Sequence, residues 1–428
     1  MAIPTSASSP VPAAAETAAT QRVALTVVTT LFFMWGFITV LNDVLVPHLK
    51  SIFDLTYAQV MLIQFAFFTA YFVFSLPAAK IVDALGYKKT MVVGLATMGV
   101  GALLFIPAAS VPSYPLFLGA LMVVAAGITA LQVAANPYVA VLGPASTASS
   151  RLNLAQAFNS LGTTIGPYVG GLFILTAAPM AMEVIRQMAP DAQQAYRVHE
   201  ASSVKGPYLL IGVVLFLLAG AIASFKLPPV PSVERHGAVA DSVWKHRNLA
   251  LGTIAIFVYV GAEVSIGSFL INYISQADIG NVSIYTAAKY VSYYWGGAMV
   301  GRFIGSAILQ KVRTGTVLGI AALVASLLVC LSMLTFGGFA MWSIILVGFF
   351  NSVMFPSIFT LGIAELGSLT GDGSGYLIMA IVGGAILPVI QGVMADKIGV
   401  HHAFILPVLC YLYIAYYAFK GSEPIVTA

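Results

Sequence analysis

Residues 23–46 read VALTVVTTLFFMWGFITVLNDVLV, an apolar run in which Asp43 is the single charged residue. The hydrocarbon core of a bilayer is ~30 Å thick, so a helix that crosses it needs ~20 mostly apolar residues. This run is long enough to cross it. A carboxylate at membrane depth is costly and commonly lines a path for a substrate or an ion. The stretch therefore predicts a membrane helix that carries a functional residue, as is typical of a transporter.

The rest of the chain has the same apolar character. Of its 428 residues, 60% are hydrophobic and 8% are charged, whereas about a quarter of the residues of a soluble domain are charged. This composition excludes a soluble protein and leaves room for twelve spans. We expect these spans at residues 23–47, 57–81, 90–109, 114–142, 151–178, 206–226, 249–274, 284–310, 315–336, 340–366, 373–395 and 402–420.

A polar stretch divides the predicted spans into two sets of six. Residues 227–248 are rich in proline and charge, which indicates a linker rather than a span. The sequence thus predicts an all-α polytopic membrane protein with six-helix bundles at 23–226 and 249–428. Residues 1–22 lack a basic start followed by a long apolar core, so we expect a disordered tail and not a cleaved signal peptide.

The distribution of lysine and arginine predicts the orientation. If the N-terminus is inside, thirteen of the nineteen basic residues fall on the cytoplasmic side and five fall in outer loops. Both termini are therefore expected in the cytoplasm of a bacterial cell, with the helices in the inner membrane. The net charge of +4 follows from this bias and gives no reason to expect a nucleic-acid partner. Cys330 and Cys410 fall inside predicted spans, so neither a disulfide nor a zinc site is expected.

Two loops on the predicted cytoplasmic side carry charges that can hold helices together in one conformation and release them in another. The loop after the second span contains Asp83, Lys88 and Lys89, and the region after the eighth contains Arg302. The first loop resembles the loop signature of the major facilitator superfamily, although Ala79 stands where that signature begins with glycine. Residues 392–399 match the signature better, but the order of the spans places them outside the cell.

Amides and hydroxyls recur inside the spans of the first half. In the fifth span, Asn153, Gln156, Asn159 and Ser160 fall at helical spacing and share one face. Such groups either bond across helices to hold a bundle together or line a polar cavity. Because amides both donate and accept hydrogen bonds, as sugar hydroxyls do, we expect a cavity for a neutral sugar, with Trp35 stacked on the ring. The further candidates on this side are Asn42, Asp43, Gln64, Gln132 and Asn136.

The second half adds two charges at membrane depth, Glu263 in the seventh span and Lys289 near the start of the eighth. These two residues can form a buried structural ion pair, or Glu263 can bind the coupling proton. Both alternatives stay open. Other polar or aromatic residues expected to complete the cavity wall are Tyr259, Asn272, Tyr293, Tyr294, Trp295 and Asn351.

Five strings resemble the fucose permease and glucose/galactose transporter group of the major facilitator superfamily over nearly the whole chain. They are FFMWGFITVLNDVLVPHLK (32–50), QVAANPYVAVLGP (132–144), RLNLAQAFNSLG (151–162), YVGAEVSIGSFLINY (259–273) and FPSIFTLGIAELG (355–367). The resemblance implies a proton-linked sugar importer, and some relatives use sodium.

The resemblance also assigns roles to single residues. Asp43 matches the carboxylate that fucose permease uses in sugar binding and proton coupling, and Gln156 and Asn159 match amides near the sugar. The second carboxylate of fucose permease is replaced here by Gln132, and Glu263 stands where that protein has an amide. The strings around Glu263 and Lys289 are closer to the glucose/galactose branch.

We therefore expect import of a neutral hexose by cation symport, with Asp43 and Glu263 as coupling residues and rocking of the two bundles exposing the site to each side in turn. The expected partners are the sugar, a proton or sodium ion, and membrane lipid, with a monomer as the default state and no cofactor, metal or catalytic residue. The alternatives are a drug or metabolite antiporter, an uncoupled sugar facilitator and a sensor that does not transport. A membrane enzyme would need paired carboxylates or metal ligands in a loop, and the sequence offers no such cluster.

Overall fold

The computed structural model describes residues 20–40, 57–111, 113–173, 184–185, 187–202, 205–228 and 243–424. Within these ranges the regular elements are helices, without strands. Eight helical stretches among them are long and apolar enough to cross a membrane. The predicted fold class, an all-α polytopic membrane protein, is confirmed.

The helices of the first half follow the predicted spans closely. The chain enters through a first helix, Thr20–Val40. The elements that follow are α2 (Tyr57–Ser110), α3 (Tyr114–Val141), the short turn Ala145–Thr147, α4 (Ala148–Phe173), α6 (Pro190–Ser202) and α7 (Lys205–Ser224). Helix α6 was not predicted, because its polar sequence does not suit a membrane span.

The second half begins with a short turn, Val243–Lys245, that leads into α8 (Arg247–Ile274). The elements after it are α9 (Ile284–Ile308), α10 (Thr314–Leu334), α11 (Gly337–Asn351), α12 (Met354–Gly362), α13 (Thr370–Met379), α14 (Gly383–Ala403), α15 (Ile405–Tyr416) and a π-helical turn, Tyr417–Gly421. Because α11 and α12 share one predicted span, and α13 and most of α14 share another, the described helices account for all twelve.

Two long elements each contain a reversal of the chain at a glycine. In α2 the break is at Gly86 (φ 78°, ψ 167°), and in α14 it is at Gly399 (φ 83°, ψ 153°). A positive φ is strained for residues with a Cβ atom and easy for glycine. Each glycine therefore separates two predicted spans: 57–81 from 90–109, and 373–395 from 402–420.

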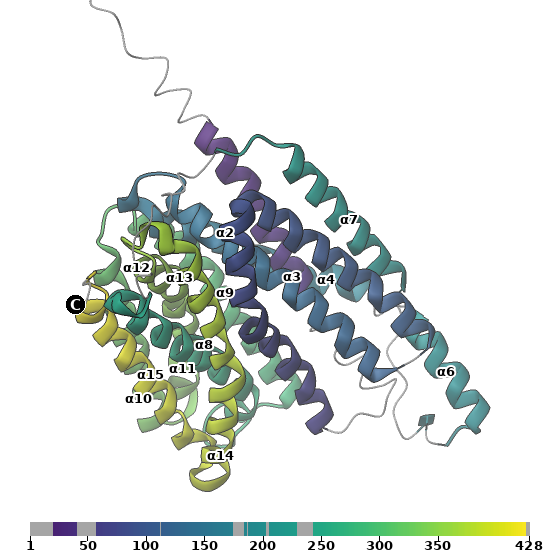
Figure 1. The fold of residues 1–428 in the computed structure, drawn as a ribbon. Coiled ribbons are helices and arrows are strands. Elements are labelled where there is room, and N and C mark those ends of the chain that lie inside the picture. Colours follow the sequence, from purple (N-terminus) through teal and green to yellow (C-terminus); the bar gives the residue numbers. More distant parts are fainter. Residues whose placement is uncertain are drawn as a thin grey trace, which may run out of the picture.

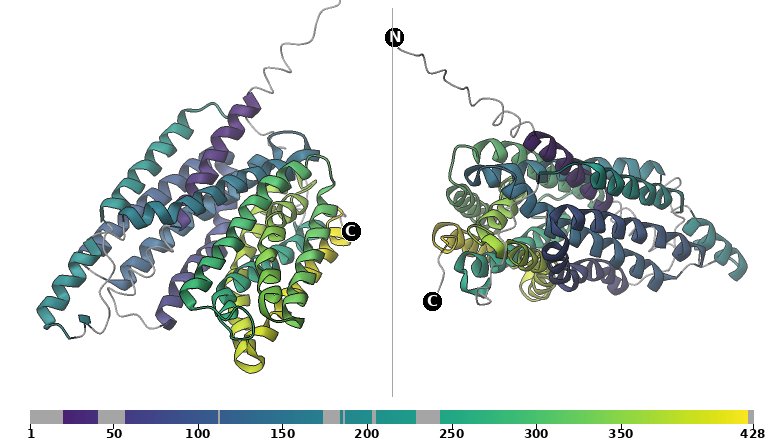
Figure 2. Two further views of the ribbon diagram at one scale, coloured as in Figure 1. Left: turned by 180° about the vertical axis from the view of Figure 1, so that it is seen from behind. Right: turned by 45° about the horizontal axis from the view of Figure 1, so that its top comes forward.

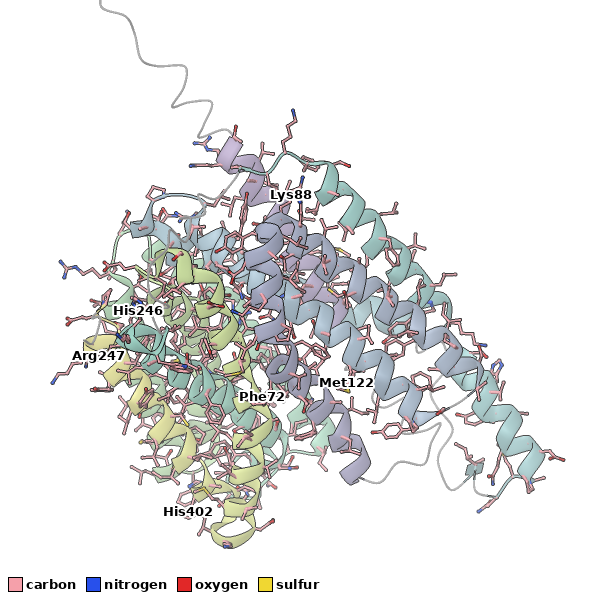
Figure 3. The ribbon with its side chains drawn as sticks, in the orientation of Figure 1. Phe72, Lys88, Met122, His246, Arg247 and His402 are labelled. Atoms are coloured by element: carbon pink, nitrogen blue, oxygen red, sulfur yellow. The ribbon has the colours of Figure 1, made fainter. Side chains whose placement is uncertain are left out.

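The two halves of the chain form two groups of helices that lie side by side (Figure 1). Figure 2 shows the same division from behind, with α6 projecting beyond the group formed by the first half. In Figure 3, Lys88 lies toward the end of the molecule where the first helix begins, and His402 lies at the other end.

Contacts between the two halves gather at one end of the molecule, which we call the sealed end. Lys80 Nζ of α2 lies 3.2 Å from Asp372 Oδ1 of α13. Ser374 Oγ of α13 donates to the carbonyl of Val133 in α3 at 2.9 Å.

A second set of these contacts joins α4 to the second half, and we call it the α4 seam. Its bonds run from Ser149 Oγ to Thr314 Oγ1 (2.9 Å) and Thr360 Oγ1 (2.5 Å), between Ser150 and Ser306, and from Asn153 Nδ2 to the carbonyl of Arg302 (2.6 Å). The seam residues of α4 precede the cavity residues of the same helix, so the two halves are closed at this end and separate beyond it.

Candidate functional site

The larger cavity lies between the two halves, just beyond the α4 seam, and has a volume of about 550 Å³. This volume falls in the range of ~300–1,000 Å³ that is typical of small-molecule sites. The first helix, α4, α8 and α9 supply its walls, so we call it the α4–α9 cavity. Its polar lining consists of Thr39, Asn159, Ser160, Thr163, Thr164, Glu263, Ser292 and Arg302, with Trp295 as the aromatic residue.

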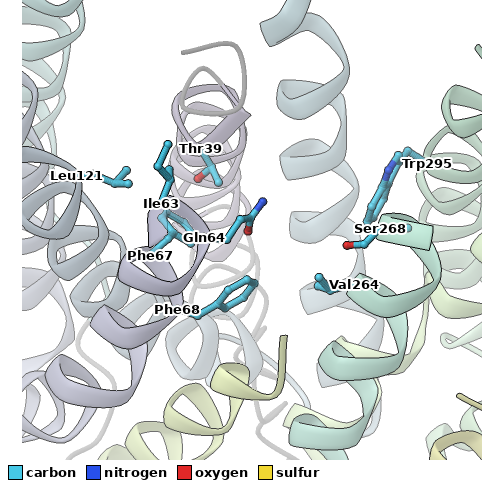
Figure 4. A pocket seen from close by; sticks show the side chains of 10 residues that line it. Thr39, Ile63, Gln64, Phe67, Phe68, Leu121, Val264, Ser268 and Trp295 are labelled. Atoms are coloured by element: carbon cyan, nitrogen blue, oxygen red, sulfur yellow. The ribbon is translucent and has the colours of Figure 1, made fainter. Parts of the chain in front are cut away.

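A second cavity of about 310 Å³ opens beside the first, between α2 and α8. The two share Thr39 and Trp295, so they form neighbouring parts of one hollow region. Figure 4 shows Gln64 and Phe68 on the side of the first half, and Val264, Ser268 and Trp295 facing them from the second half. Gln64 is exposed, in keeping with its place on this wall.

Glu263 is the carboxylate of the α4–α9 cavity and is held from behind by buried hydroxyls. Tyr259 lies one turn earlier on α8, and its hydroxyl donates to Glu263 Oε1 at 2.8 Å. The Tyr294 hydroxyl lies 3.5 Å from the backbone carbonyl of Glu263 and accepts from Asn351 Nδ2 at 2.8 Å. Asn351 is thus fully buried behind the wall and does not line the cavity itself.

The sequence predicted Arg302 in a cytoplasmic loop, but the structure places it elsewhere. It is part of α9, six residues before that helix ends, and it lines the α4–α9 cavity together with Glu263. Its Nη1 donates to Ser160 Oγ and lies 3.5 Å from the carbonyl of Gln156. The loop placement was wrong because Arg302 falls within the predicted span 284–310, and the helix continues to Ile308.

Lys289 does not pair with Glu263. Both residues are described, yet no ion pair joins them among the described residues, and the Lys289 side chain is exposed. The cationic side chain that lines the α4–α9 cavity together with Glu263 is that of Arg302. The structural pair with Lys289, one of the two alternatives that the sequence left open, is therefore not formed in this structure.

The amide stripe of α4 divides between the seam and the cavity. Asn159 lines the cavity, and its Nδ2 donates to the carbonyl of Phe32 in the first helix at 2.9 Å. Asn153 is fully buried in the seam, and Gln156 is buried between them, with its backbone carbonyl facing Arg302. The helical spacing of these residues had predicted that the whole stripe would face one cavity.

The first helix lies directly against α4 beside these residues. A Cβ atom on Gly36 would collide with the backbone carbonyl of Asn159, and one on Gly162 would collide with that of Phe33. The absence of side chains at both glycines lets the two backbones approach closely. This approach brings the first helix near enough for Thr39 to join the cavity wall.

Two amides of α3 are buried away from both cavities. Gln132 Nε2 donates to the Tyr71 hydroxyl at 2.7 Å. Asn136 is fully buried, and neither atom of its amide has a partner among the described residues. These two residues therefore belong to the interior of the first half in this conformation.

Trp35 and Trp295 occupy contrasting environments. Trp35 is 7% exposed, packs against Phe32 with ring centroids 5.3 Å apart, and lines neither cavity. Trp295 is 44% exposed and lines both cavities. Trp295 is therefore the aromatic residue of the α4–α9 cavity, whereas Phe67 and Phe68 add aromatic surface to the second cavity.

Two of the predicted site residues, Asn42 and Asp43, lie outside the described residues. Of the predicted gating residues, Asp83 is exposed, and its Oδ1 lies 2.8 Å from where a Cβ atom on Gly371 would be. Lys88 donates to the carbonyl of Ala223 at 2.8 Å, and Lys89 is exposed.

Some lining residues were missed from the sequence, including Thr39, Thr163, Ser268 and Ser292. A signal for the α9 wall was present, because Ser292, Trp295 and Arg302 recur at intervals of three and seven residues and so share a helix face. In the part of the chain that the structure describes, no three His, Cys, Asp or Glu residues gather into a group that could hold a metal ion.

Comparison with known proteins places this geometry among transporters. A family profile described as Major Facilitator Superfamily matches residues 24–388. The chain is 53% identical over 404 residues to the glucose/galactose transporter of Brucella abortus biovar 1 (strain 9-941), with 94% of each chain covered. It is 35% identical over 402 residues to the L-fucose-proton symporter of Escherichia coli (strain K12), with 92% of each covered.

The solved structures include a similar protein in a stated conformation. A crystal structure of the transporter FucP in the outward conformation matches with a TM-score of 0.85 at 34% identity, over 93% of this chain and 98% of that one. At this coverage the likeness extends over both helix groups.

Proposed function

The chain belongs to the Major Facilitator Superfamily, and we propose that it imports a neutral hexose, glucose or galactose before fucose, by proton-coupled symport. The observation that carries this proposal is the α4–α9 cavity, in which Asn159, Ser160, Thr163 and Ser292 surround a carboxylate and an aromatic face. Amides and hydroxyls match the donors and acceptors of a sugar. The glucose/galactose transporter and fucose-proton symporter similar to this chain support the same substrate class.

The transport cycle that we propose is alternating access. The cavity lies between the two helix groups, and the sealed end closes one side of it. Such a site reaches the opposite side when the groups rock against each other. We place the helices in the bacterial inner membrane with both termini in the cytoplasm. In this orientation the sealed end faces the cytoplasm and the cavity opens outward.

Two carboxylates are proposed to couple a proton to the sugar. Asp43, outside the described residues, keeps the role that its resemblance to fucose permease implies. Glu263 lies in the cavity wall, where a protonation change alters both its charge and its hydrogen bonding. Coupling requires that the proton and the sugar favour the same conformational change.

Ligand-induced thermal stabilisation of the purified protein tests the substrate class. A ligand at 100 times its Kd stabilises the folded state by ~2.7 kcal/mol, so glucose, galactose or fucose is expected to raise the unfolding temperature, whereas an apolar cation such as tetraphenylphosphonium is not. Stabilisation by the apolar cation alone would instead support a drug antiporter. Asp43→Asn is expected to abolish accumulation, and accumulation by that variant would contradict the coupling role.

A further inference from the structure

Arg302 stands at the point where the α4–α9 cavity meets the α4 seam. Along α9, Ser292 and Trp295 line the cavity, and Ser306 belongs to the seam one turn beyond Arg302. Along α4 the order is matched, since Ser160 lines the cavity and Asn153 lies in the seam. Arg302 therefore lines the site where a ligand would bind with its side chain and joins the α4 seam with its backbone.

The bonds of Arg302 cross from the second half of the chain to the first. Its Nη1 donates to Ser160 Oγ and approaches the carbonyl of Gln156 at 3.5 Å. Its own carbonyl accepts from Asn153 Nδ2 at 2.6 Å. Arg302 is thus attached to α4 by both its side chain and its backbone.

The charge of Arg302 is compensated from the cavity. Glu263 is the carboxylate that lines the α4–α9 cavity together with Arg302, and Lys289 makes no ion pair with that carboxylate among the described residues. The other titratable groups around Glu263 in the described part of the chain are the hydroxyls of Tyr259, Tyr294 and Tyr411, which are uncharged near neutral pH. In the described part of the chain, neutralising Glu263 would therefore leave the cavity wall around the guanidinium without a carboxylate.

Arg302 is half-buried in the cavity wall. A charge partly withdrawn from water is costly without a counter-charge, and such a side chain tends to move toward water. The Arg302 Nε is already buried without a hydrogen-bond partner among the described residues. If Glu263 loses its charge, withdrawal of the guanidinium toward the open cavity both relieves this cost and breaks the bonds to Ser160 and Gln156.

From this geometry we propose that Arg302 couples the charge of Glu263 to the closure of the α4 seam. While Glu263 is ionised, Arg302 stays at the cavity floor and ties α9 to α4. When Glu263 takes up a proton, Arg302 releases α4 and the sealed end opens. The proposal rests on the proposed function in one respect: the proton that neutralises Glu263 is taken to be the coupling ion.

The test measures how fast the sealed end opens and needs no sugar. Ser374 is fully buried at the contact between α13 and α3, so a cysteine introduced there by Ser374→Cys reports opening through its alkylation by N-ethylmaleimide. Both native cysteines, Cys330 and Cys410, are replaced by alanine in this background. The alkylation rate is compared among the Arg302 protein and the variants E263Q, R302Q and E263Q/R302Q.

We expect E263Q to raise the alkylation rate severalfold in the Arg302 protein and to add nothing in the R302Q background. The matched control is Ser306→Ala, which weakens the seam without touching the cavity charge, so E263Q and S306A are expected to multiply their effects. The proposal would be overturned if E263Q left the alkylation rate unchanged. It would also be overturned if E263Q raised the rate by the same factor in the R302Q background as in the protein that retains Arg302.

A second variant keeps the test decisive if R302Q cannot be recovered as a monodisperse protein. Ser160→Ala removes the acceptor on α4 and leaves the guanidinium in place, so the same loss of response to E263Q is expected. A full response to E263Q in S160A would equally overturn the proposal. Because the rates are measured without ligand, absence of sugar uptake would contradict the proposed function and leave this result standing.

Discussion

Ser150 and Ser306 exchange hydrogen bonds across the boundary between the two halves of the molecule. Ser150 Oγ donates to the carbonyl of Ser306 at 2.7 Å, and Ser306 Oγ donates to the carbonyl of Ser150 at 3.1 Å. Both serines are buried. Each hydroxyl is therefore satisfied by the backbone of the opposite half, and separation of the halves breaks both bonds at once.

Removal of either hydroxyl should shift the protein toward the open seam. A buried hydrogen bond contributes ~0.5–1.5 kcal/mol, so Ser150→Ala or Ser306→Ala is expected to raise the open population about fivefold. The alkylation rate of a cysteine at Ser374 measures this population. The control is Ser110→Ala, which removes an exposed bond within one helix. An open population that stays the same in both seam variants would show that this serine pair does not hold the halves together.

The ion pair between Lys80 and Asp372 should matter much less than its position suggests. The Lys80 side chain is 70% exposed, and exposed ion pairs contribute ~0–1 kcal/mol. We expect Lys80→Gln to change the transport rate by less than about fivefold, a change that ~1 kcal/mol accounts for. The comparison is Lys89→Gln, a neighbouring exposed lysine, in the same uptake assay. A much larger loss in Lys80→Gln alone would mean that the pair is a principal lock.

Substitution of Trp295 should affect sugar binding, whereas substitution of Trp35 should affect stability. Trp295→Ala removes an exposed aromatic face from both cavities, so we expect sugar affinity to fall by about tenfold, or ~1.4 kcal/mol, with little change in unfolding temperature. Trp35→Ala empties a buried site, and the loss of a large buried side chain costs ~3–5 kcal/mol. Calorimetric sugar binding and thermal unfolding distinguish the two. The reverse pattern would assign the stacking surface to Trp35.

Replacing the glycine at either chain reversal with alanine should destabilise the folded protein. Gly86 and Gly399 have φ values of 78° and 83°, and a left-handed conformation costs an L-residue ~1–2 kcal/mol. Gly86→Ala and Gly399→Ala are each expected to lower the unfolding free energy by this amount. Gly220 in α7 has open space around its Cα and no positive φ, so Gly220→Ala should be neutral or slightly stabilising. Equal stability of all three variants would contradict the strain argument.

Much of the architecture could be predicted because a membrane constrains each span strongly. Spans of ~20 apolar residues leave a clear pattern, and the twelve predicted segments correspond to described helices. Helix boundaries were less predictable at glycines. The reversals at Gly86 and Gly399 occupy fewer residues than the gaps expected between spans, because a single positive φ turns the chain.

The candidate site was predictable in its residue types and less so in its contacts. Glu263, Asn159 and Gln64 line the hollow region as their polarity suggested. An ion pair of Glu263 with Lys289 on the adjacent helix was one of two alternatives left open by the sequence, whereas in the structure Arg302 is the cation that lines the cavity with Glu263. Such a choice depends on which helix faces meet, and hydrophobic periodicity does not specify this.

Uptake into proteoliposomes tests the central claim most directly. Radiolabelled glucose, galactose and fucose are each offered under an inward proton gradient, under an inward sodium gradient and without a gradient. The proposed function predicts that one of these sugars accumulates above its external concentration under the proton gradient and only equilibrates without it. Failure of all three sugars to accumulate under either gradient, in vesicles that contain folded protein, would contradict sugar symport.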